Sequence, residues 1–320
     1  MEFRVKIVMI TENDPAGMGI AFTNAINRHT EHSCRLITTT TKYNFDFEKD
    51  LHVPDLDEDG LEEIRDLLRN ADIIHFHILA DENIELGPIT VKDFTKGKAM
   101  LHHHHGHPDF RAHPEKYQEK YRRLKRKVLV STPDLLRLVP EATWQPNLVP
   151  INDPPYLPLS GGGNGRVRIC HSPTRKDLKN TGEFDVVADS LQGKYVNLDK
   201  VIIENAPHQE CLMIKQQCDI HFDHMQGYFG VSSLEGLSQG KPVIAGLDDW
   251  NIECIKEFTD TDKLPWRIAR SQGELEDKLE EVIADRNLRN TIGMESRRFM
   301  EEHWTERHVL QSLIEFYENL

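Results

Sequence analysis

The sequence is poor in cysteine and has no pattern that would pair the few it contains. Five cysteines are scattered over 320 residues, their number is odd, and no two of them form a C-x-x-C pair. A disulfide framework is therefore a poor explanation, and free thiols in a reducing compartment are the simplest interpretation.

Long apolar runs are missing as well. No run approaches the roughly 18 apolar residues that a membrane-spanning helix requires. The amino-terminal segment MEFRVKIVMI is short, carries charges and lacks the hydrophobic region of a signal peptide. We therefore expect a cytoplasmic chain with no integral membrane segment, one that at most contacts the inner face of a membrane peripherally.

Positive charge is in deficit, with a formal net charge of −14 at pH 7. A general nucleic-acid coat or a binder of anionic membranes needs a dominant positive field, so the net charge argues against both classes. A local basic patch is still compatible with this balance.

The order of apolar segments predicts an α/β protein with two domains. A chain of 320 residues exceeds one ordinary core, since roughly 150 residues per domain is the expectation. Residues 150–165 hold four prolines and four glycines, which is typical of a linker. Short strands alternate with helices on both sides of this linker, which predicts two parallel, doubly wound, Rossmann-like sheets.

The predicted strands cover residues 5–10, 34–38, 71–77, 98–102, 128–132, 148–149, 167–171, 201–204, 219–222 and 243–245. The predicted helices cover residues 20–26, 61–70, 87–94, 114–126, 133–138, 180–191, 209–217, 275–284, 288–300 and 307–320.

The most informative stretch is residues 222–246, FDHMQGYFGVSSLEGLSQGKPVIAG. It is typical of a loop with a glycine turn, a short helix that carries Glu235, a tight corner and a buried strand. A helix that begins at such a turn offers free backbone N–H groups and a positive dipole end, which suit a phosphate. Glu235 lies about one and a half turns inside this helix, from where its carboxylate could reach the hydroxyls of an adjacent ribose.

Two cations follow the strand predicted at residues 167–171. Arg175 and Lys179 lie after the carboxyl end of that strand, where ligands bind in open α/β sheets. Arginine as a bidentate fork and lysine as a point charge could together bind a diphosphate. A solvated basic turn is the alternative. Two anion-binding elements in one half of the chain favour the diphosphate of a nucleotide.

Two other motif types are incomplete. The loop with Gly17 and Gly19 follows the first strand, but it lacks the third glycine of a dinucleotide fingerprint, and a simple tight turn explains it equally well. An NAD oxidoreductase is therefore the weakest option. No D-x-D motif follows a strand end to hold a metal and a diphosphate, and Asp55 and Asp57 are typical of a solvated acidic turn. We therefore expect no metal and no other cofactor.

Histidines gather at residues 102–107, HHHHGH. In a strand, alternate side chains point to opposite faces, so four successive histidines cannot share one ion, although His103, His105 and His107 could share a side. No cysteine is near, and carboxylate support comes from Asp109 alone. An active-site loop is favoured over inert histidines, and both are favoured over a metal site.

Two further segments each allow two interpretations. His75 and His77 are better explained as strand residues near a cleft than as metal ligands. The basic segment from Lys120 to Lys127 has six cations among eight residues. It is either a solvated helix face or a patch for a phosphate-bearing acceptor or a membrane surface.

Together these motifs resemble the glycosyltransferases of the GT-B fold, and they are most similar to the retaining family 4 enzymes. The matching pieces are Asp14-Pro-x-Gly17, Ala71-Asp-x-x-His75-x-His77, Ser131-Thr132-Pro133, His171-Ser-Pro-Thr-Arg175-x-x-x-Lys179, Phe229-Gly230-x-x-x-x-Glu235, Gly240-Lys241-Pro242-Val243-Ile244 and the terminal pattern from Trp304 to Tyr317. The resemblance covers nearly the whole chain, and its central and carboxyl-terminal motifs are the specific ones.

The resemblance implies two Rossmann-like domains that face each other across a cleft. An acceptor-side domain would cover residues 1–155 and a nucleotide-sugar domain residues 156–302. A terminal helix over residues 303–320 would pack back toward the first domain.

The resemblance also implies a role for each site residue. Arg175 and Lys179 would bind the donor diphosphate and stabilise the leaving nucleotide, and His105 would contact the transferred sugar or line the acceptor side. Arg111 and His107 would also lie on the acceptor side. The donor would be bound by Gly17, Gly19, His208, Gly227, Gly230, Val231, Ser232, Ser233 and Glu235.

The sequence departs from the family pattern at one position. Family members usually carry an acid eight residues before the position of Glu235, and here that residue is Gly227. The task of this acid on the sugar hydroxyls must be absent or reassigned, for instance to the backbone N–H of Gly227. The identity of the donor sugar is therefore left open.

The hypothesis that results is a metal-independent, retaining glycosyltransferase of the hexosyl or a related class. It would move a sugar from a nucleotide-diphosphate sugar to a hydroxyl of a glycan, lipid-linked, protein or nucleic-acid acceptor. The alternatives are a sugar-nucleotide epimerase or a phosphorylase of similar fold, and a nucleotide-sugar-binding protein without turnover. An epimerase would convert a nucleotide sugar alone, whereas the missing acid at Gly227 keeps the binding protein open.

Overall fold

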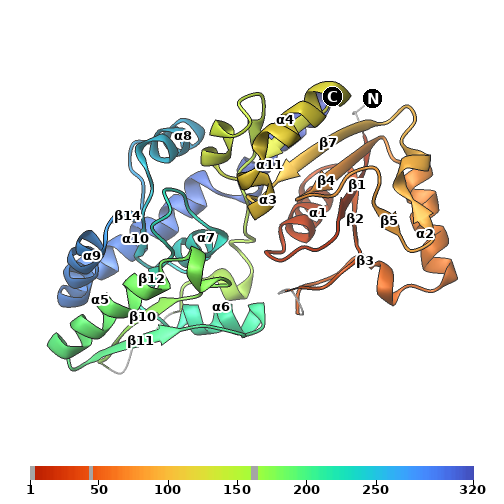
Figure 1. The fold of residues 1–320 in the computed structure, drawn as a ribbon. Coiled ribbons are helices and arrows are strands. Elements are labelled where there is room, and N and C mark those ends of the chain that lie inside the picture. The colour runs from red at the N-terminus through yellow and green to blue at the C-terminus, as the bar shows by residue number, and fades with distance from the viewer. Residues whose placement is uncertain (1–3, 43–45, 160–164) are drawn as a thin grey trace. The chain divides into compact units, whose positions relative to one another are not determined.

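The chain folds into two compact units, each built on a parallel sheet (Figure 1). The computed structural model describes residues 4–42, 46–159 and 165–320. The first unit contains the chain up to Leu148 and again from Arg307 to the end, and the second unit is Val149–Glu306. The prediction of two parallel, doubly wound α/β halves is confirmed.

The first unit has a seven-stranded sheet in the order β3-β2-β1-β4-β7-β8-β9, and every pairing in it is parallel. Its strands are β1 (Lys6–Thr11), β2 (Ser33–Thr38), β3 (Leu51–His52), β4 (Ile73–His77), β7 (Ala99–His104), β8 (Lys127–Val130) and β9 (Thr143–Trp144), and β5 (Glu85–Leu86) and β6 (Ile89–Thr90) form a separate antiparallel pair. The strand order reverses between β1 and β4, which makes the loops at their carboxyl ends the expected place for a ligand.

Helices cover both faces of this sheet. They are α1 (Met18–His29), α2 (Glu58–Asn70), α3 (Pro108–Ala112), α4 (Pro114–Leu124) and α11 (Glu306–Glu318), with 3-10 turns at Val53–Asp55, Val91–Phe94 and Pro133–Arg137. Ile64 and Leu68 of α2 pack into one cluster with Val8 of β1. On the other face, the Thr23 hydroxyl of α1 contacts the sulfur of Met9 at 3.6 Å.

The second unit has a five-stranded parallel sheet in the order β11-β10-β12-β13-β14. Its strands are β10 (Val167–His171), β11 (Leu198–Ile202), β12 (Ile220–Phe222), β13 (Val243–Ala245) and β14 (Arg267–Ile268). Its helices are α5 (Thr181–Lys194), α6 (His208–Gln216), α7 (Val231–Ser238), α8 (Asp249–Thr259), α9 (Gln272–Ala284) and α10 (Arg286–His303), with 3-10 turns at Pro154–Tyr156 and Lys176–Leu178. The order reverses between β10 and β12, so a second ligand position is expected there.

Two apolar layers hold this second sheet. Helices α5 and α9 cover one face, where Phe184 and Leu279 share a cluster with Phe222 of β12. Helix α6 covers the other face, where Ile214 packs near Cys170 of β10.

Helix α11 packs on the first unit, which confirms the prediction that the terminal helix packs back toward the amino-terminal domain. The hydroxyl of Tyr317 lies 2.7 Å from Nδ1 of His75 in β4. The side chain of Gln145 donates to the Val309 carbonyl at 3.0 Å, and the Ser312 hydroxyl donates back to Gln145 at 3.0 Å.

Several predicted elements differ from the structure. Strand β7 does not break at the first histidine but continues through His104. Residues 87–94 form a short strand and a 3-10 turn rather than a helix, and the last strand of the first sheet lies at Thr143–Trp144 instead of residues 148–149. Helix α8 was not predicted.

Asp57 has a structural role that a solvated turn would not give it, because its carboxylate accepts a hydrogen bond from Gly60 N at 3.0 Å and caps α2. All five cysteines are free, as expected. Within the described ranges, no helix combines the length and the apolar character needed to cross a membrane.

Helix α7 lies very close to its sheet because Gly236 faces β12 and β13. A methyl group placed at Gly236 would lie 2.3 Å from Nδ1 of His221 and 2.9 Å from Cγ2 of Val243. The His221 ring cannot move away freely, since it is buried and its Nε2 contacts the Lys215 carbonyl at 3.0 Å. The absence of a side chain at Gly236 therefore sets the position of α7.

We predict that Gly236→Ala destabilises the protein by roughly 1–3 kcal/mol, because the added methyl group overpacks the interface between α7 and the sheet. Gly193→Ala in α5 is the matched control, since a methyl group there meets no atom within 4 Å. That change should stabilise by about 0.5–1 kcal/mol through helix propensity. Chemical denaturation of both variants checks the prediction, and equal effects of the same sign would contradict it.

Candidate functional site

The candidate site of the second unit lies where β10 and β12 end side by side. His171 closes β10, and its ring nitrogens contact the Phe222 carbonyl at 3.2 Å and the Thr181 hydroxyl at 2.9 Å. Burial lowers the pKa of His171 to about 4, so the ring is neutral at pH 7. A neutral, buried ring therefore joins the ends of both strands to the start of α5.

Asn180 connects the two loops that follow these strands. It adopts a left-handed conformation with φ of 54° at the start of α5. Its side-chain oxygen accepts hydrogen bonds from Met225 N at 2.8 Å and from the Gln226 amide at 3.0 Å. The loop with Arg175 and Lys179 is thus held against the loop that leads into α7.

A buried acid, Asp223, organises the start of α7. Its Oδ2 accepts hydrogen bonds from Gly230 N at 2.6 Å and from the Ser233 hydroxyl at 2.8 Å. Lys179 Nζ lies 3.6 Å from its Oδ1. Burial alone would raise the pKa of Asp223, but His224, Lys179 and these hydrogen bonds hold it well below its usual range. The carboxylate therefore fixes the helix start and Lys179 together.

Asp223 is a site residue that sequence reasoning missed. The signal that could have identified it is its position directly after the predicted strand at residues 219–222, the sheet edge where ligand loops begin.

Glu235 lies on the buried side of α7 and is held by two basic side chains. His208 Nε2 is 2.8 Å from its Oε1, and Lys215 forms an ion pair with its Oε2. Lys215 also donates to the hydroxyl of Ser232 at 2.7 Å. Burial would raise the pKa of Glu235, but the charges of Lys215 and His208 and their hydrogen bonds lower it to about 2.

Lys215 is a second residue that the sequence did not reveal. Its side chain is 3% exposed, and burial alone would lower its pKa, yet the attraction of Glu235 raises it above the usual range. Lys215 and Glu235 are therefore both charged at neutral pH. The structure brings Glu235 and His208 into contact, and the donor-binding role of both stays a prediction.

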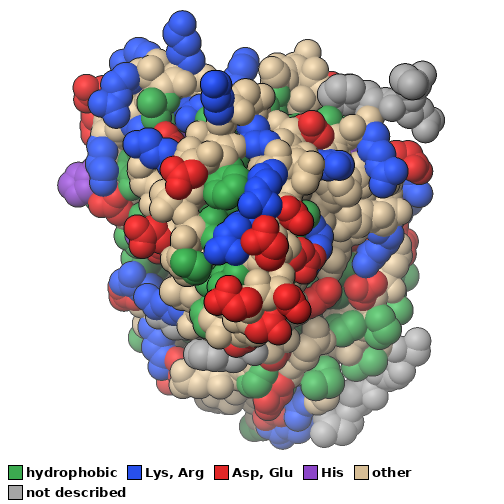
Figure 2. Space-filling view, turned by 90° about the vertical axis from the view of Figure 1, so that its right-hand side faces the viewer, with side chains coloured by type: hydrophobic (Ala, Val, Ile, Leu, Met, Phe, Trp, Pro, Cys, Tyr) green, Lys and Arg blue, Asp and Glu red, His purple; other side chains and the backbone are tan. Residues whose placement is uncertain are grey.

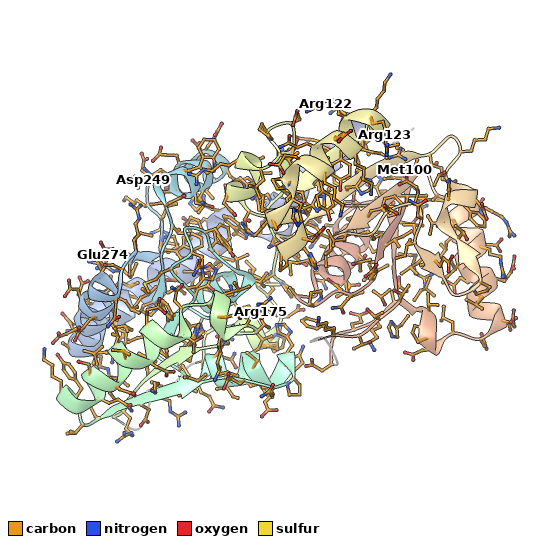
Figure 3. The ribbon with its side chains drawn as sticks, in the orientation of Figure 1. Met100, Arg122, Arg123, Arg175, Asp249 and Glu274 are labelled. Atoms are coloured by element: carbon orange, nitrogen blue, oxygen red, sulfur yellow. The ribbon has the colours of Figure 1, made fainter. Side chains whose placement is uncertain are left out.

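Arg175 lies on the exposed part of the loop after β10 (Figure 3). Its guanidinium forms an ion pair with Asp177 in the same loop, and its side chain is 49% exposed. Lys179 lies deeper, since its Nζ is 3.2 Å from a methyl group placed at Gly230. The Ser172 side chain connects this loop to α7, because the Ser172 hydroxyl lies 3.1 Å from the Ser232 hydroxyl.

Gly227 occupies a position where a side chain would be strained. Its φ is 90°, in the left-handed region that favours glycine. Its carbonyl accepts a hydrogen bond from Asp248 N at 2.8 Å, and a methyl group at Gly227 would lie 3.6 Å from Oδ2 of Asp248. The local backbone thus explains why no acid stands at this position.

In the first unit, the loop with Gly17 and Gly19 is closed by an acid of its own. Gly17 has a φ of 66° at the start of α1. The Asp14 carboxylate accepts hydrogen bonds from Gly19 N at 3.1 Å and Ile20 N at 3.0 Å. Burial raises the pKa of Asp14 against the effect of these bonds. At the start of α1, these two N–H groups are therefore already satisfied by the chain.

The three predicted residues near the carboxyl end of β7 have separate surroundings. His105 is half-buried, its Nε2 lies 3.0 Å from His77 Nδ1, and burial lowers the pKa of His105 to about 4. Arg111 donates to the Gly106 carbonyl at 3.2 Å and pairs with Asp134 at 2.6 Å. His107 is exposed and accepts a hydrogen bond from Asp109 N at 3.1 Å, which starts α3.

The basic segment on α4 is partly neutralised. Lys120 forms an ion pair with Asp81, Arg126 with Glu82 at 3.4 Å, and Arg122 with Glu141 at 3.6 Å. Figure 3 labels Arg122 and Arg123 on this helix. Figure 2 views a different face, on the side of α2, where acidic side chains also lie between basic ones. These pairs fit a solvated helix face, and membrane contact through this segment stays a prediction.

A cavity of about 770 Å³ lies at the other end of the second sheet. Its lining includes Arg166 before β10, Asp219 before β12 and Lys241 before β13. Ligands of open α/β sheets bind at the carboxyl ends of strands, so we do not assign the predicted ligand to this cavity.

The arrangement at the ends of β10 and β12 can bind an anion and a neighbouring diol. Lys179, the exposed Arg175 and the amino end of α7 supply positive potential, and the ionised Glu235 supplies hydrogen-bond acceptors. The buried histidines His75, His77 and His103 of the first unit are a set that could hold a metal ion.

No family model and no curated protein matches the sequence. Solved structures, however, match nearly its whole length. Anabaena HepE in complex with UDP-glucose aligns with a TM-score of 0.68 at 11% identity, over 99% of this chain and 100% of that chain. Sucrose-phosphate synthase from Thermosynechococcus elongatus aligns with a TM-score of 0.59 at 12% identity, over 98% of both chains.

A third similar structure is an alpha-glucosyltransferase in complex with UDP and a 13-mer DNA that contains a HMU base. It aligns with a TM-score of 0.60 at 11% identity, over 98% of this chain and 99% of that chain. At such low identity the likeness concerns the fold. The chain has the two-domain GT-B fold of glycosyltransferases.

Proposed function

We propose that this protein is a metal-independent, retaining glycosyltransferase that moves a sugar from a nucleotide-diphosphate sugar to an acceptor hydroxyl. One observation carries the proposal. Lys179 (which contacts Asp223), the start of α7 and the ionised Glu235 all follow the same edge of the second sheet. The GT-B fold, and neighbours solved with UDP or UDP-glucose, support it.

The chemistry requires charge stabilisation rather than a nucleophile. Breaking an anomeric C–O bond leaves a cationic sugar and builds negative charge on the departing diphosphate. Preorganised donors and cations at that diphosphate lower the barrier most, because they interact more strongly with the transition state than with the substrate. Lys179, Arg175 and the N–H groups from Gly230 to Ser233 would supply this without a metal.

Glu235 would bind the ribose of the donor. An ionised carboxylate has about four lone-pair sites, and Lys215 and His208 use one contact on each oxygen. The remaining sites can accept hydrogen bonds from vicinal hydroxyls. His208 would then lie next to the nucleoside, where its ring could line the base pocket.

The acceptor would be bound by the first unit, through His105, Arg111 and His107. Since burial keeps His105 neutral at pH 7, it would act as a hydrogen-bonding group rather than as a cation. A neighbouring structure contains a DNA acceptor, and a glycan, lipid-linked, protein or nucleic-acid hydroxyl fits the proposal here.

The second candidate is a nucleotide-sugar-binding protein without turnover. Gly227 favours it, because it replaces the acid that would handle the sugar hydroxyls and its left-handed backbone disfavours any side chain at this position. A sugar-nucleotide epimerase of similar fold would be distinguished by the conversion of a nucleotide sugar in the absence of any acceptor.

The proposal is tested by a thermal-shift screen of the full chain with UDP, GDP, ADP, CMP and TDP, followed by the sugars of the nucleotide that binds. A stabilising nucleotide sugar that is transferred without added Mg²⁺ or Mn²⁺ supports the proposal. Tight donor binding with no hydrolysis or transfer over hours supports the binding protein instead. An NMR assay of the product that shows an inverted anomeric configuration would refute the retaining assignment.

We predict that Arg175→Ala and Lys179→Ala each lower kcat by roughly 10²–10³, the effect of removing one preorganised group from a developing oxyanion. Arg166→Ala is the matched control, because Arg166 lies at the opposite end of the same strand and pairs with Asp199 at 2.5 Å. Steady-state kinetics checks both changes. Wild-type turnover of the Arg175 variant with several donors would show that the diphosphate assignment is wrong.

We also predict that the stability advantage of the wild type over Glu235→Gln shrinks by about 2 kcal/mol between pH 6 and pH 3. The pKa of Glu235 falls to about 2 from a usual value of 4.5, so the unfolded chain binds this proton more readily. The contribution is therefore complete above pH 4.5 and is lost as the pH falls toward 2. Denaturant unfolding at several pH values measures it.

The control for this experiment is Glu253→Gln, which changes a carboxylate that is 71% exposed. Its stability difference from the wild type should stay nearly constant over the same range. A Glu235→Gln difference that does not vary with pH would mean that the buried ion pair does not hold this carboxylate ionised.

A further inference from the structure

Three buried histidines meet on one face of the first sheet. His75 and His77 come from β4, and His103 comes from the neighbouring β7, where it pairs in register with His77. One ring nitrogen of each lies within 4.8 Å of the others. Their exposed fractions are 0%, 2% and 0%. The face is the one covered by α1, since the Phe22 ring lies 5.8 Å from that of His103.

The Nδ1 atoms of His75 and His77 both have hydrogen-bond partners. His75 Nδ1 lies 2.7 Å from the Tyr317 hydroxyl, and His77 Nδ1 lies 3.0 Å from His105 Nε2. If each Nδ1 carries the proton and donates it outward, the lone pair of each ring is on Nε2. The free lone pair of each β4 ring is then on the nitrogen that has no hydrogen-bond partner within the described ranges.

The other four ring nitrogens of the cluster have no hydrogen-bond partner among the residues that the structure describes. They are Nε2 of His75 and His77 and both nitrogens of His103. A buried polar group without a partner costs roughly 1–3 kcal/mol, and four such atoms within one cluster are rare in a folded protein. A core built only to be stable would hold apolar side chains here.

We propose that His75, His77 and His103 bind one transition-metal ion of the zinc class. The arrangement has the two features of such sites. Three imidazoles from rigid strands provide the ligands, and an outer hydrogen bond fixes the tautomer of two of them. The Tyr317 hydroxyl and His105 form the outer shell, and a water molecule would complete a tetrahedron.

The donor set selects the metal. No carboxylate and no thiolate belongs to the described cluster, so the oxygen-seeking ions Mg²⁺ and Ca²⁺ do not fit. Neutral imidazole suits Zn²⁺, Ni²⁺, Co²⁺ and Cu²⁺.

The geometry needs only a small contraction. Two nitrogens bound tetrahedrally at about 2.0–2.1 Å from zinc lie roughly 3.4 Å apart. The ring nitrogens here lie up to 4.8 Å apart, a difference that small rotations of the side chains can cover. The rings of His75 and His77 are now stacked at 4.3 Å, and those of His75 and His103 at 5.4 Å.

An ion that binds the folded chain alone would stabilise the first unit. It would link β4 to β7 directly and, through the hydrogen bond between His75 and Tyr317, would stabilise the position of α11. It would lie in the first unit, whereas the proposed diphosphate ligands Arg175 and Lys179 belong to the second. Its outer-shell residue His105 is also a proposed acceptor-side residue, so the ion would orient that ring without contacting the donor. The inference thus departs from the expectation of no bound metal without placing a metal in the transfer reaction.

The test uses the full chain without a histidine tag, stripped of metal with a chelator and then titrated with Co²⁺ and Zn²⁺. We expect calorimetry to give one tight equivalent, Co²⁺ to show the intense visible absorption of a tetrahedral site, and Zn²⁺ to raise Tm. X-ray absorption spectroscopy of the zinc-loaded wild type should show three histidine nitrogens in the coordination shell of zinc. Absence of a stoichiometric equivalent, or a spectrum of octahedral Co²⁺ on surface histidines, overturns the proposal.

Two variants of neighbouring residues separate binding from packing. His103→Leu should abolish the tight equivalent, whereas His102→Leu should keep it, because His102 is equally buried in β7 but stacks on Phe76 on the opposite face. Both remove a buried histidine from the same strand. If His103→Leu binds the metal as the wild type does, the proposal is wrong. Should that variant not fold, the ligand count in the wild type decides alone.

Discussion

The buried carboxylate of Asp223 is the interaction on which the candidate site depends. It contacts Gly230 N, the Ser233 hydroxyl and Lys179 at once. An ionised carboxylate left alone in the interior would be very costly, so these contacts form together and place the start of α7 beside Lys179. Lys179 is therefore shared between Asp223 and any arriving anion. In the proposed function, a bound diphosphate would draw this lysine partly away from its acid and would thereby couple the donor to the start of α7.

The charges of this site nearly cancel before any ligand arrives. Lys179 pairs with Asp223, Lys215 with Glu235 and Arg175 with Asp177. Since each cation has an acid, the attraction for a diphosphate comes from rearrangement of these pairs and from the backbone dipoles of α7 rather than from net charge. The proposed diphosphate site is in this way compatible with a strongly acidic chain. Arg175, the most exposed of the three cations, needs the least desolvation to change partner.

The fold and part of the site were predictable because both depend on local patterns. Buried parallel strands are short apolar runs, and β10 was predicted to the residue. Glu235 and Lys179 were predicted from motifs next to strand ends. Lys215 was missed because its pairing with Glu235 spans 20 residues, and nothing in a helix marks a lysine as buried. Helix α8 was missed because two of its three buried positions are the polar Asn251 and Thr259, so the apolar periodicity of its buried face is weak.

The histidines of β4 and β7 show most clearly what local sequence patterns cannot predict. A run of polar residues indicates a loop, yet β7 continues through it because aromatic residues cover both faces: Phe22 contacts His103, and Phe110 stacks on His104 at 3.8 Å. Alternation along β7 correctly excludes four histidines around one ion, but it says nothing about β4. His77 and His103 become neighbours only through the register of two strands that are separated by 21 intervening residues. A ligand set divided between strands is therefore a property of topology, and it becomes visible only once the order of the sheet is known.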